Sequence, residues 1–178
     1  MNWEKTTNEE LLRLSKVEVQ SAQKLPVVVV LDNVRSHLNV GSVFRTCDAF
    51  LVEGIYCCGI TGTPPHRDIQ KTALGATETV SWRYEAQTLT ALEALRAEGY
   101  KIAVVEQVKG SISLEAFQLT AHEKLAVIFG NEVDGVDAEV VRMADYAIEI
   151  PQWGSKHSLN VAVSAGIVLW ELRRNTRK

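Results

Sequence analysis

The sequence lacks the features of a membrane, secreted or metal-binding protein. None of its apolar runs approaches the ~20 residues that a transmembrane helix needs. The N-terminal Met-Asn-Trp-Glu-Lys does not have the basic-then-apolar layout of a signal peptide. Three cysteines, of which Cys57 and Cys58 are adjacent, make a poor disulfide framework and show no zinc-ligand spacing. We therefore expect a cytoplasmic protein that neither spans a membrane nor binds a metal.

Two common phosphate-binding motifs are also missing. The glycine fingerprint of dinucleotide binding and the P-loop do not occur, which argues against a metabolic α/β enzyme that uses a nucleotide. The net charge of −3 excludes a broad phosphate-binding surface, so any contact with nucleic acid would use local patches. The clearest patch is the C-terminal segment with Arg173, Arg174, Arg177 and Lys178, which a solvated chain end explains equally well.

The composition is that of one ordinary globular domain, with 46% apolar and 23% charged residues in 178. We place this domain at 1–178, with an N-terminal helical extension at 1–24 and a basic tail at 173–178. Strand and helix patterns alternate without a repeat or a linker. This alternation predicts an α/β fold, a mostly parallel six-stranded sheet flanked by helices.

The strands are predicted from short β-branched and apolar runs between turn residues. We expect strands near 27–31, 54–60, 78–84, 101–106, 125–129 and 146–150. Pro151 cannot donate to a sheet ladder and should end the last of them. The segment 109–119 is less regular and is predicted as a loop or a short helix.

The helices are predicted from apolar spacing and from capping residues. Helices are expected near 7–20, 39–51, 67–76, 89–99 and 137–143, followed by a C-terminal helix that starts at 158. Thr7 with Glu10 forms a capping box for the first, and Asn39, Asp137 and Ser158 are predicted N-caps. The core face of the C-terminal helix is expected to carry Val163, Gly166, Ile167 and Trp170. The core face of the helix at 39–51 is expected to carry Val40, Val43, Phe44, Cys47 and Leu51.

Three polar loops follow the carboxyl ends of predicted strands, at 32–45, 130–136 and 151–160. Loops in these positions converge on one pocket in a parallel sheet. Gly41 lets another backbone or a ligand approach closely. Taken singly, each of three residues is better explained without a function: Arg45 as an exposed salt-bridge arginine, Glu132 as a surface loop carboxylate and Ser158 as a plain helix cap.

Together the three loops resemble the SpoU (TrmH-type) family of RNA ribose methyltransferases in the SPOUT superfamily. The first carries Asn-x-Gly-x-x-x-Arg and the second Phe-Gly-x-Glu-x-x-Gly, while the third carries Ile-Pro-x-x-Gly-x-x-x-Ser-Leu-Asn-Val. These patterns correspond to Asn39, Gly41 and Arg45, then to Phe129, Gly130, Glu132 and Gly135, and then to Ile150 through Val161. The resemblance runs from about Val27 to Leu172, and it departs at Gln152, where many members carry Met.

The resemblance implies a sheet whose C-terminal segment threads a trefoil knot, and a homodimer with its active site near the interface. It implies S-adenosylmethionine as the cofactor, with Gly130, Ile150 and Leu159 contacting it largely through backbone atoms. Glu106 and Gln107 follow the strand at 101–106 and are expected to line the same cavity, although no motif fixes them.

The implied reaction is methyl transfer to a ribose 2′-hydroxyl, with Arg45 as the essential residue. Because a guanidinium stays protonated, we expect Arg45 to clamp an RNA phosphate, and a role in proton removal stays open. Asn39 would orient Arg45 or the ribose, and Glu132 would organise the loops. Ser158 and Asn160 would fix the third loop and the target hydroxyl.

Transfer RNA is the preferred substrate, because a short chain must recognise its target with the catalytic domain and its tails. Ribosomal RNA and a non-catalytic RNA- or cofactor-binding module with the same fold are the alternatives. His66 and His157 are tempting bases that occupy no motif position, so we interpret both as solvated loop residues. Trp153 would stack on a base or pack at a dimer interface.

Overall fold

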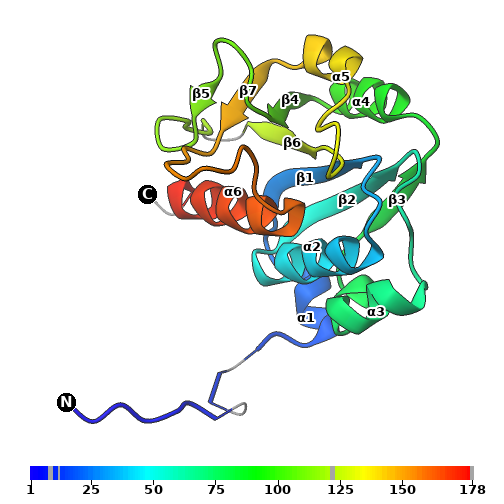
Figure 1. Cartoon of the computed structure of the whole chain (residues 1–178). Helices are drawn as coiled ribbons and strands as arrows, with labels where there is room; N and C mark the ends of the chain where they lie inside the picture. Colours follow the sequence, from blue (N-terminus) through cyan, green and yellow to red (C-terminus); the bar gives the residue numbers. More distant parts are fainter. Residues whose placement is uncertain (8–9, 12, 121–122, 177–178) are drawn as a thin grey trace.

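The computed structural model describes residues 1–7, 10–11, 13–120 and 123–176. Its centre is a parallel sheet with the strand order β3-β2-β1-β6-β4-β7-β5 (Figure 1). The strands are β1 (Leu25–Asp32), β2 (Val52–Cys58), β3 (Trp82–Glu85), β4 (Tyr100–Val105), β5 (Ile112–Ser113), β6 (Lys124–Phe129) and β7 (Tyr146–Glu149). The helices are α1 (Lys16–Ser21), α2 (His37–Ala49), α3 (Arg67–Ala73), α4 (Thr88–Ala97), α5 (Ala138–Met143) and α6 (Val161–Asn175), with a 3₁₀ turn at Ala76–Glu78.

Helices cover both faces of the sheet, because alternate residues of the central strands point in opposite directions. Val27, Val29 and Leu31 of β1 belong to a core that α2, α3 and α6 complete, whereas Val28 and Val30 face α4 and α5. Every one of these β1 side chains is at most 4% exposed. The central strands are therefore buried on both sides, as expected for a parallel sheet.

The predicted parallel sheet is confirmed, but the structure has seven strands where the sequence predicted six. The additional strand, β5, lies in the segment predicted as a loop or a short helix. Its two residues pair with the edge of β7 and are too few to show any apolar alternation. Strand β3 begins four residues later than predicted, because the 3₁₀ turn extends to Glu78 and the chain pairs with β2 only from Trp82 on.

Two predicted helix caps are displaced along the chain. Ser36, not Asn39, is the N-cap of α2, and it accepts a hydrogen bond from the backbone of Asn39. Asn160, not Ser158, is the N-cap of α6, and its Oδ1 accepts from the backbone N–H of Ala162 at 2.9 Å. Each true cap lies two or three residues from the predicted one, among several polar residues that all cap well.

The core face predicted for α6 is wrong. Val163, Ile167 and Trp170 are 51%, 38% and 58% exposed, respectively. The buried face consists of Val161, Ala165, Val168, Leu169 and Leu172. Apolar residues surround much of this helix, so periodicity alone did not identify the stripe that meets the sheet.

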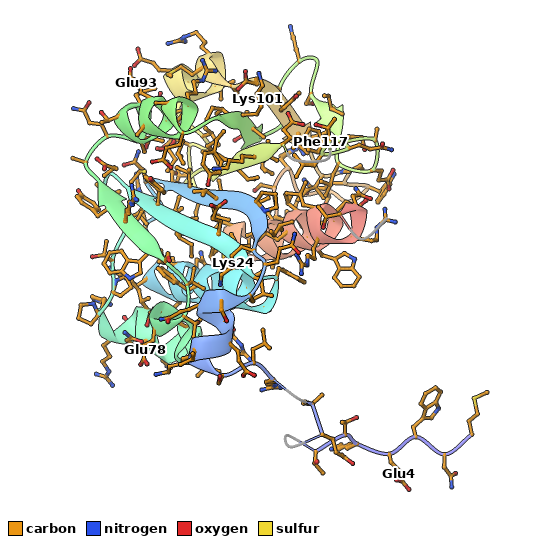
Figure 2. The ribbon with its side chains drawn as sticks, turned by 180° about the vertical axis from the view of Figure 1, so that it is seen from behind. Glu4, Lys24, Glu78, Glu93, Lys101 and Phe117 are labelled. Atoms are coloured by element: carbon orange, nitrogen blue, oxygen red, sulfur yellow. The ribbon has the colours of Figure 1, made fainter. Side chains whose placement is uncertain are left out.

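The N-terminal helix is shorter than predicted. The hydrogen bonds of the Thr7–Glu10 capping box are present, but α1 begins only at Lys16, after a second box between Ser15 and Glu18. Positions 8–9 and 12 of the prediction lie outside the described residues. The first residues run away from the sheet, as the place of Glu4 in Figure 2 shows. The predicted stripe of Leu11, Leu14 and Val17 is exposed, so no packing stabilises a longer helix.

In the described part of the chain, no helix combines the length and the apolar character needed to cross a bilayer.

Candidate active site

A cavity of about 520 Å³ opens at the carboxyl ends of β4, β6 and β7. Its walls include most of the residues predicted for the site: Glu106, Gln107, Gly130, Glu132, Ile150, Ser158, Leu159 and Asn160. They converge because parallel strands end at one edge of the sheet, so loops distant in sequence become neighbours in space.

The loop 130–136 after β6 forms one wall and folds tightly upon itself. Asn131 and Gly135 form a bridge, and Asn131 Oδ1 accepts hydrogen bonds from the backbone N–H groups of Val133 and Asp134, each at 2.8 Å. A Cβ atom at Gly130 would lie 2.0 Å from the carbonyl carbon of Gly135. Gly135 has a φ of +71°, where a side chain adds strain. The two glycines of the second motif therefore serve the turn itself.

Glu132 ties this loop to the loop after β1. Its carboxylate accepts hydrogen bonds from the backbone N–H groups of Arg35 and Ser36, both at 3.2 Å, and from Asn39 Nδ2 at 2.9 Å. Burial opposes ionisation of Glu132, but these hydrogen bonds outweigh it and hold its pKa below the ordinary value. Glu132 is thus an ionised acceptor at neutral pH.

Asn39 continues the connection to the third loop. Its Oδ1 accepts a hydrogen bond from Asn160 Nδ2 at 3.1 Å, while its Nδ2 donates to Glu132. Because Asn160 also caps α6, the network joins three segments that each carry one sequence motif. Asn39 does not line the cavity but holds two residues that do.

Arg45 stands apart from the other predicted site residues. It lies on the exposed face of α2 and does not line the cavity of its own chain. The neighbouring Gly41 faces α3, where a Cβ atom would lie 2.2 Å from the carbonyl oxygen of Ile69. Of the two predicted alternatives, a backbone or a ligand, it is a backbone that approaches Gly41, and that backbone belongs to α3.

The remaining candidates are Ser158, His157 and Trp153 of the third loop, all of them exposed, and His66. Ser158 and His157 both line the cavity, whereas Trp153 is 87% exposed and does not. His66 does not line the cavity, and its ring stacks on that of His37, with ring centroids 3.8 Å apart. The described contacts thus place His157, but not His66, beside the candidate site.

Sequence reasoning missed Glu149, which also lines the cavity. It precedes Ile150 at the end of β7, and the rule that selected the other loops selects this position too. Four carboxylates, from Glu106, Glu132, Asp134 and Glu149, line the cavity, and no described lining residue is lysine or arginine. Among the described residues, one of these four carboxylates forms an ion pair: Asp134 lies 3.9 Å from Arg35.

Residues 26–170 match the SpoU rRNA methylase family. The chain is 30% identical to the tRNA (guanosine(18)-2′-O)-methyltransferase of Thermus thermophilus over 161 residues, which are 90% of this chain and 81% of that one. The match covers a smaller share of the length of other relatives: 9% of a mouse protein and 52% of each of three mycobacterial proteins.

Solved structures agree with this match. The Aquifex aeolicus TrmH/SpoU tRNA modifying enzyme is 28% identical with a TM-score of 0.81, covering 91% of this chain and 81% of that one. An AdoMet-bound rRNA methyltransferase from Sinorhizobium meliloti is 29% identical with a TM-score of 0.78, covering 85% and 60%. With the family pattern matched along most of its length, this chain belongs to the SpoU (TrmH-type) methylase family of the SPOUT superfamily.

Proposed function

We propose that this protein is an S-adenosylmethionine-dependent methyltransferase that methylates a ribose 2′-hydroxyl, with transfer RNA as its substrate. The observation that carries the proposal is the network of Glu132, Asn39 and Asn160, which joins all three family motifs beside one cavity. Relatives named as tRNA ribose methyltransferases and a cofactor-bound relative support the activity and the cofactor.

The cavity suits S-adenosylmethionine in size and in chemistry. Ligand pockets of about 300–1,000 Å³ hold molecules of this class, and the cavity here lies within that range at about 520 Å³. Its walls include Gly130, Ile150 and Leu159, which we expect to offer backbone atoms, and Glu106 and Gln107, which bring a carboxylate and an amide. These residues would hold the cofactor, which when bound supplies a methyl group on a positively charged sulfur.

The chain itself must position the ribose hydroxyl and favour loss of its proton. Asn160 and Ser158 border the cavity at the start of α6 and would orient the hydroxyl. Glu132 and Asn39 hold Asn160 in place through the hydrogen bonds described above. Arg45 would clamp an RNA phosphate with its planar pair of donors, next to the hydroxyl.

Arg45 can reach a cavity if two copies of the chain pair. The exposed Val163, Ile167 and Trp170 form an apolar stripe on α6, and Trp170 lies beside Phe50 at the end of α2, with ring centroids 6.1 Å apart. Because α2 and α6 lie side by side (Figure 1) and Arg45 is exposed on α2, we assign this stripe and Arg45 to one dimer surface. An isologous dimer through that surface would bring Arg45 of one protomer to the cavity of its partner.

The trefoil knot implied by the resemblance also belongs to this proposal. The connection from β4 to β6 runs over the face of the sheet that α6 shares, because Leu114 and Phe117 pack in the same core as Val168 and Leu169. The chain leaves β7 at Glu149 and returns to place α6 beside α2. This arrangement supports passage of the segment 150–160 beneath that connection, within a single domain.

A labelled-methyl assay on total RNA, with identification of the modified nucleoside, tests the proposal. We expect a 2′-O-methylated nucleoside in the transfer RNA fraction. Label in ribosomal RNA, the substrate of the named Sinorhizobium relative, would select the alternative substrate. Cofactor binding without any label would leave a non-catalytic binding module, and a methylated base would contradict the ribose chemistry.

A further inference from the structure

Two of the carboxylates that line the cavity come from matching positions on neighbouring strands. Val105 of β4 pairs in register with Ile148 of β7, and Glu106 and Glu149 are the next residues on these neighbouring strands. The backbone N–H of Glu106 donates to the carbonyl of Ile148 at 3.0 Å, which keeps the strands together at this point. Both side chains are half-buried and line the cavity.

The two carboxylates are held differently. Glu106 accepts hydrogen bonds on both oxygens, from the backbone N–H of Gln107 at 2.9 Å and of Val136 at 3.1 Å. Glu149 accepts on Oε2 from Ser111 Oγ at 2.8 Å, and no described residue bonds to its Oε1. Glu106 therefore braces the loop 130–136, whereas Glu149 keeps one oxygen for a ligand.

Neighbouring like charges on adjacent strands destabilise a sheet unless a cation compensates them. No lysine or arginine among the described residues lines this cavity, and neither carboxylate forms an ion pair within the described chain. The lining residues and the family match identify the cavity as a ligand site independently of these charges. The carboxylates add a preference for a positively charged ligand over a neutral one.

We infer that Glu149, supported by Glu106, is a specificity-determining residue that favours the positively charged methyl donor over its neutral-sulfur product. This inference rests on the proposed function. S-adenosylmethionine carries a sulfonium, whereas S-adenosylhomocysteine, which lacks the transferred methyl group and is otherwise the same molecule, has a neutral sulfur. A nearby carboxylate stabilises the first ligand and leaves the sulfur of the second unaffected. Loss of the charge on methyl transfer would then weaken binding and promote exchange of product for donor.

Calorimetric titration of the intact protein with each of the two ligands, without RNA, tests the inference. In Glu149→Gln, which keeps the size of the side chain, we expect affinity for S-adenosylmethionine to fall about tenfold and affinity for S-adenosylhomocysteine to fall less than about threefold. Glu106→Gln should likewise lower the ratio of the affinity for S-adenosylmethionine to the affinity for S-adenosylhomocysteine. Glu93→Gln, an exposed site on the outer side of α4, removes an equal charge and should leave the ratio unchanged (Figure 2).

If Glu149 has a purely structural role, Glu149→Gln should lower the affinities for both ligands equally, and that result would overturn the inference. Unchanged affinities in the folded Glu149→Gln and Glu106→Gln proteins would also overturn it. A wild-type protein that binds neither ligand would instead overturn the proposed function, so the two failures are distinguishable.

Discussion

Asn39 Nδ2 donates a hydrogen bond to Glu132 Oε1 at 2.9 Å, across 93 positions of the sequence. The same amide accepts from Asn160 on its other side, so one small side chain joins the first family motif to both of the others. An amide side chain donates through its nitrogen and accepts through its oxygen at the same time. The asparagine at this position uses both of these groups.

Replacement of Asn39 by aspartate should uncouple the three loops. The new carboxylate cannot donate to Glu132 and would repel it, so we expect a loss of about 2 kcal/mol in the free energy of unfolding. Weaker cofactor binding should accompany this loss. Denaturant unfolding and calorimetric titration measure the two effects. Asn175→Asp removes a similar donor to Glu171, far from the cavity, and should leave cofactor affinity unchanged.

Glu132 should make the stability of the protein depend on pH in the acid range. Its pKa is lowered in the folded state, so its contribution is complete above the ordinary value of 4.5 and is lost as the pH falls through the lower, folded value. The difference in unfolding free energy between wild type and Glu132→Gln should therefore be larger at pH 6 than at pH 3.5. A difference that stays constant between these two pH values would contradict this account.

Gly130→Ala should damage the loop 130–136 more than a comparable change elsewhere. The new methyl group would meet backbone atoms of Gly135 and Val136 at 2.0 to 2.2 Å, and backbone atoms cannot move aside as a flexible side chain can. We expect a destabilisation of about 2–3 kcal/mol and a loss of cofactor binding. Gly154→Ala is the matched control, because its Cβ atom would meet nothing within 4 Å. Thermal melts of the two variants should separate clearly.

Arg45→Ala should lower the rate of methyl transfer by about 100-fold or more and leave cofactor binding nearly intact. The side chain lies outside the cavity of its own chain, so its loss removes no contact there. Single-turnover methyl transfer and cofactor titration provide the two measurements. Arg45→Lys keeps the charge without the planar pair of donors and should rescue little activity. Wild-type activity in Arg45→Ala would refute the proposed mechanism.

Trp170→Glu should dissociate the proposed dimer. A charge in the middle of the apolar stripe on α6 would oppose burial of that stripe, while the 58% exposed side chain contributes little to the monomer core. Sedimentation velocity should show a shift from dimer to monomer, with loss of methyl transfer. Ile60→Glu, at a 64% exposed position in the loop after β2 and outside the stripe on α6, should leave the assembly unchanged. A wild-type protein that sediments as a monomer would contradict the pairing.

Six of the seven strands and the location of the cavity were predictable, because both depend on local signals. The valine run before Asp32 is buried on both faces, and each loop that lines the cavity follows a strand. Strand β5 was not predictable, because its two residues become a strand only by pairing with β7. The caps of α2 and α6 were each misplaced, because neighbouring Ser and Asn residues offer equal local capping.

Apart from β5, the sequence by itself determined the order of strands and helices, together with the three motif loops and the family, because apolar periodicity and motif residues are local properties of the chain. Only the tertiary structure decided which face of α6 is buried, that Glu149 stands beside Glu106, and that Arg45 lies outside the cavity of its own chain. These three facts depend on which strand pairs with which and on how helices pack. Such contacts join residues far apart in sequence, and no local pattern records them.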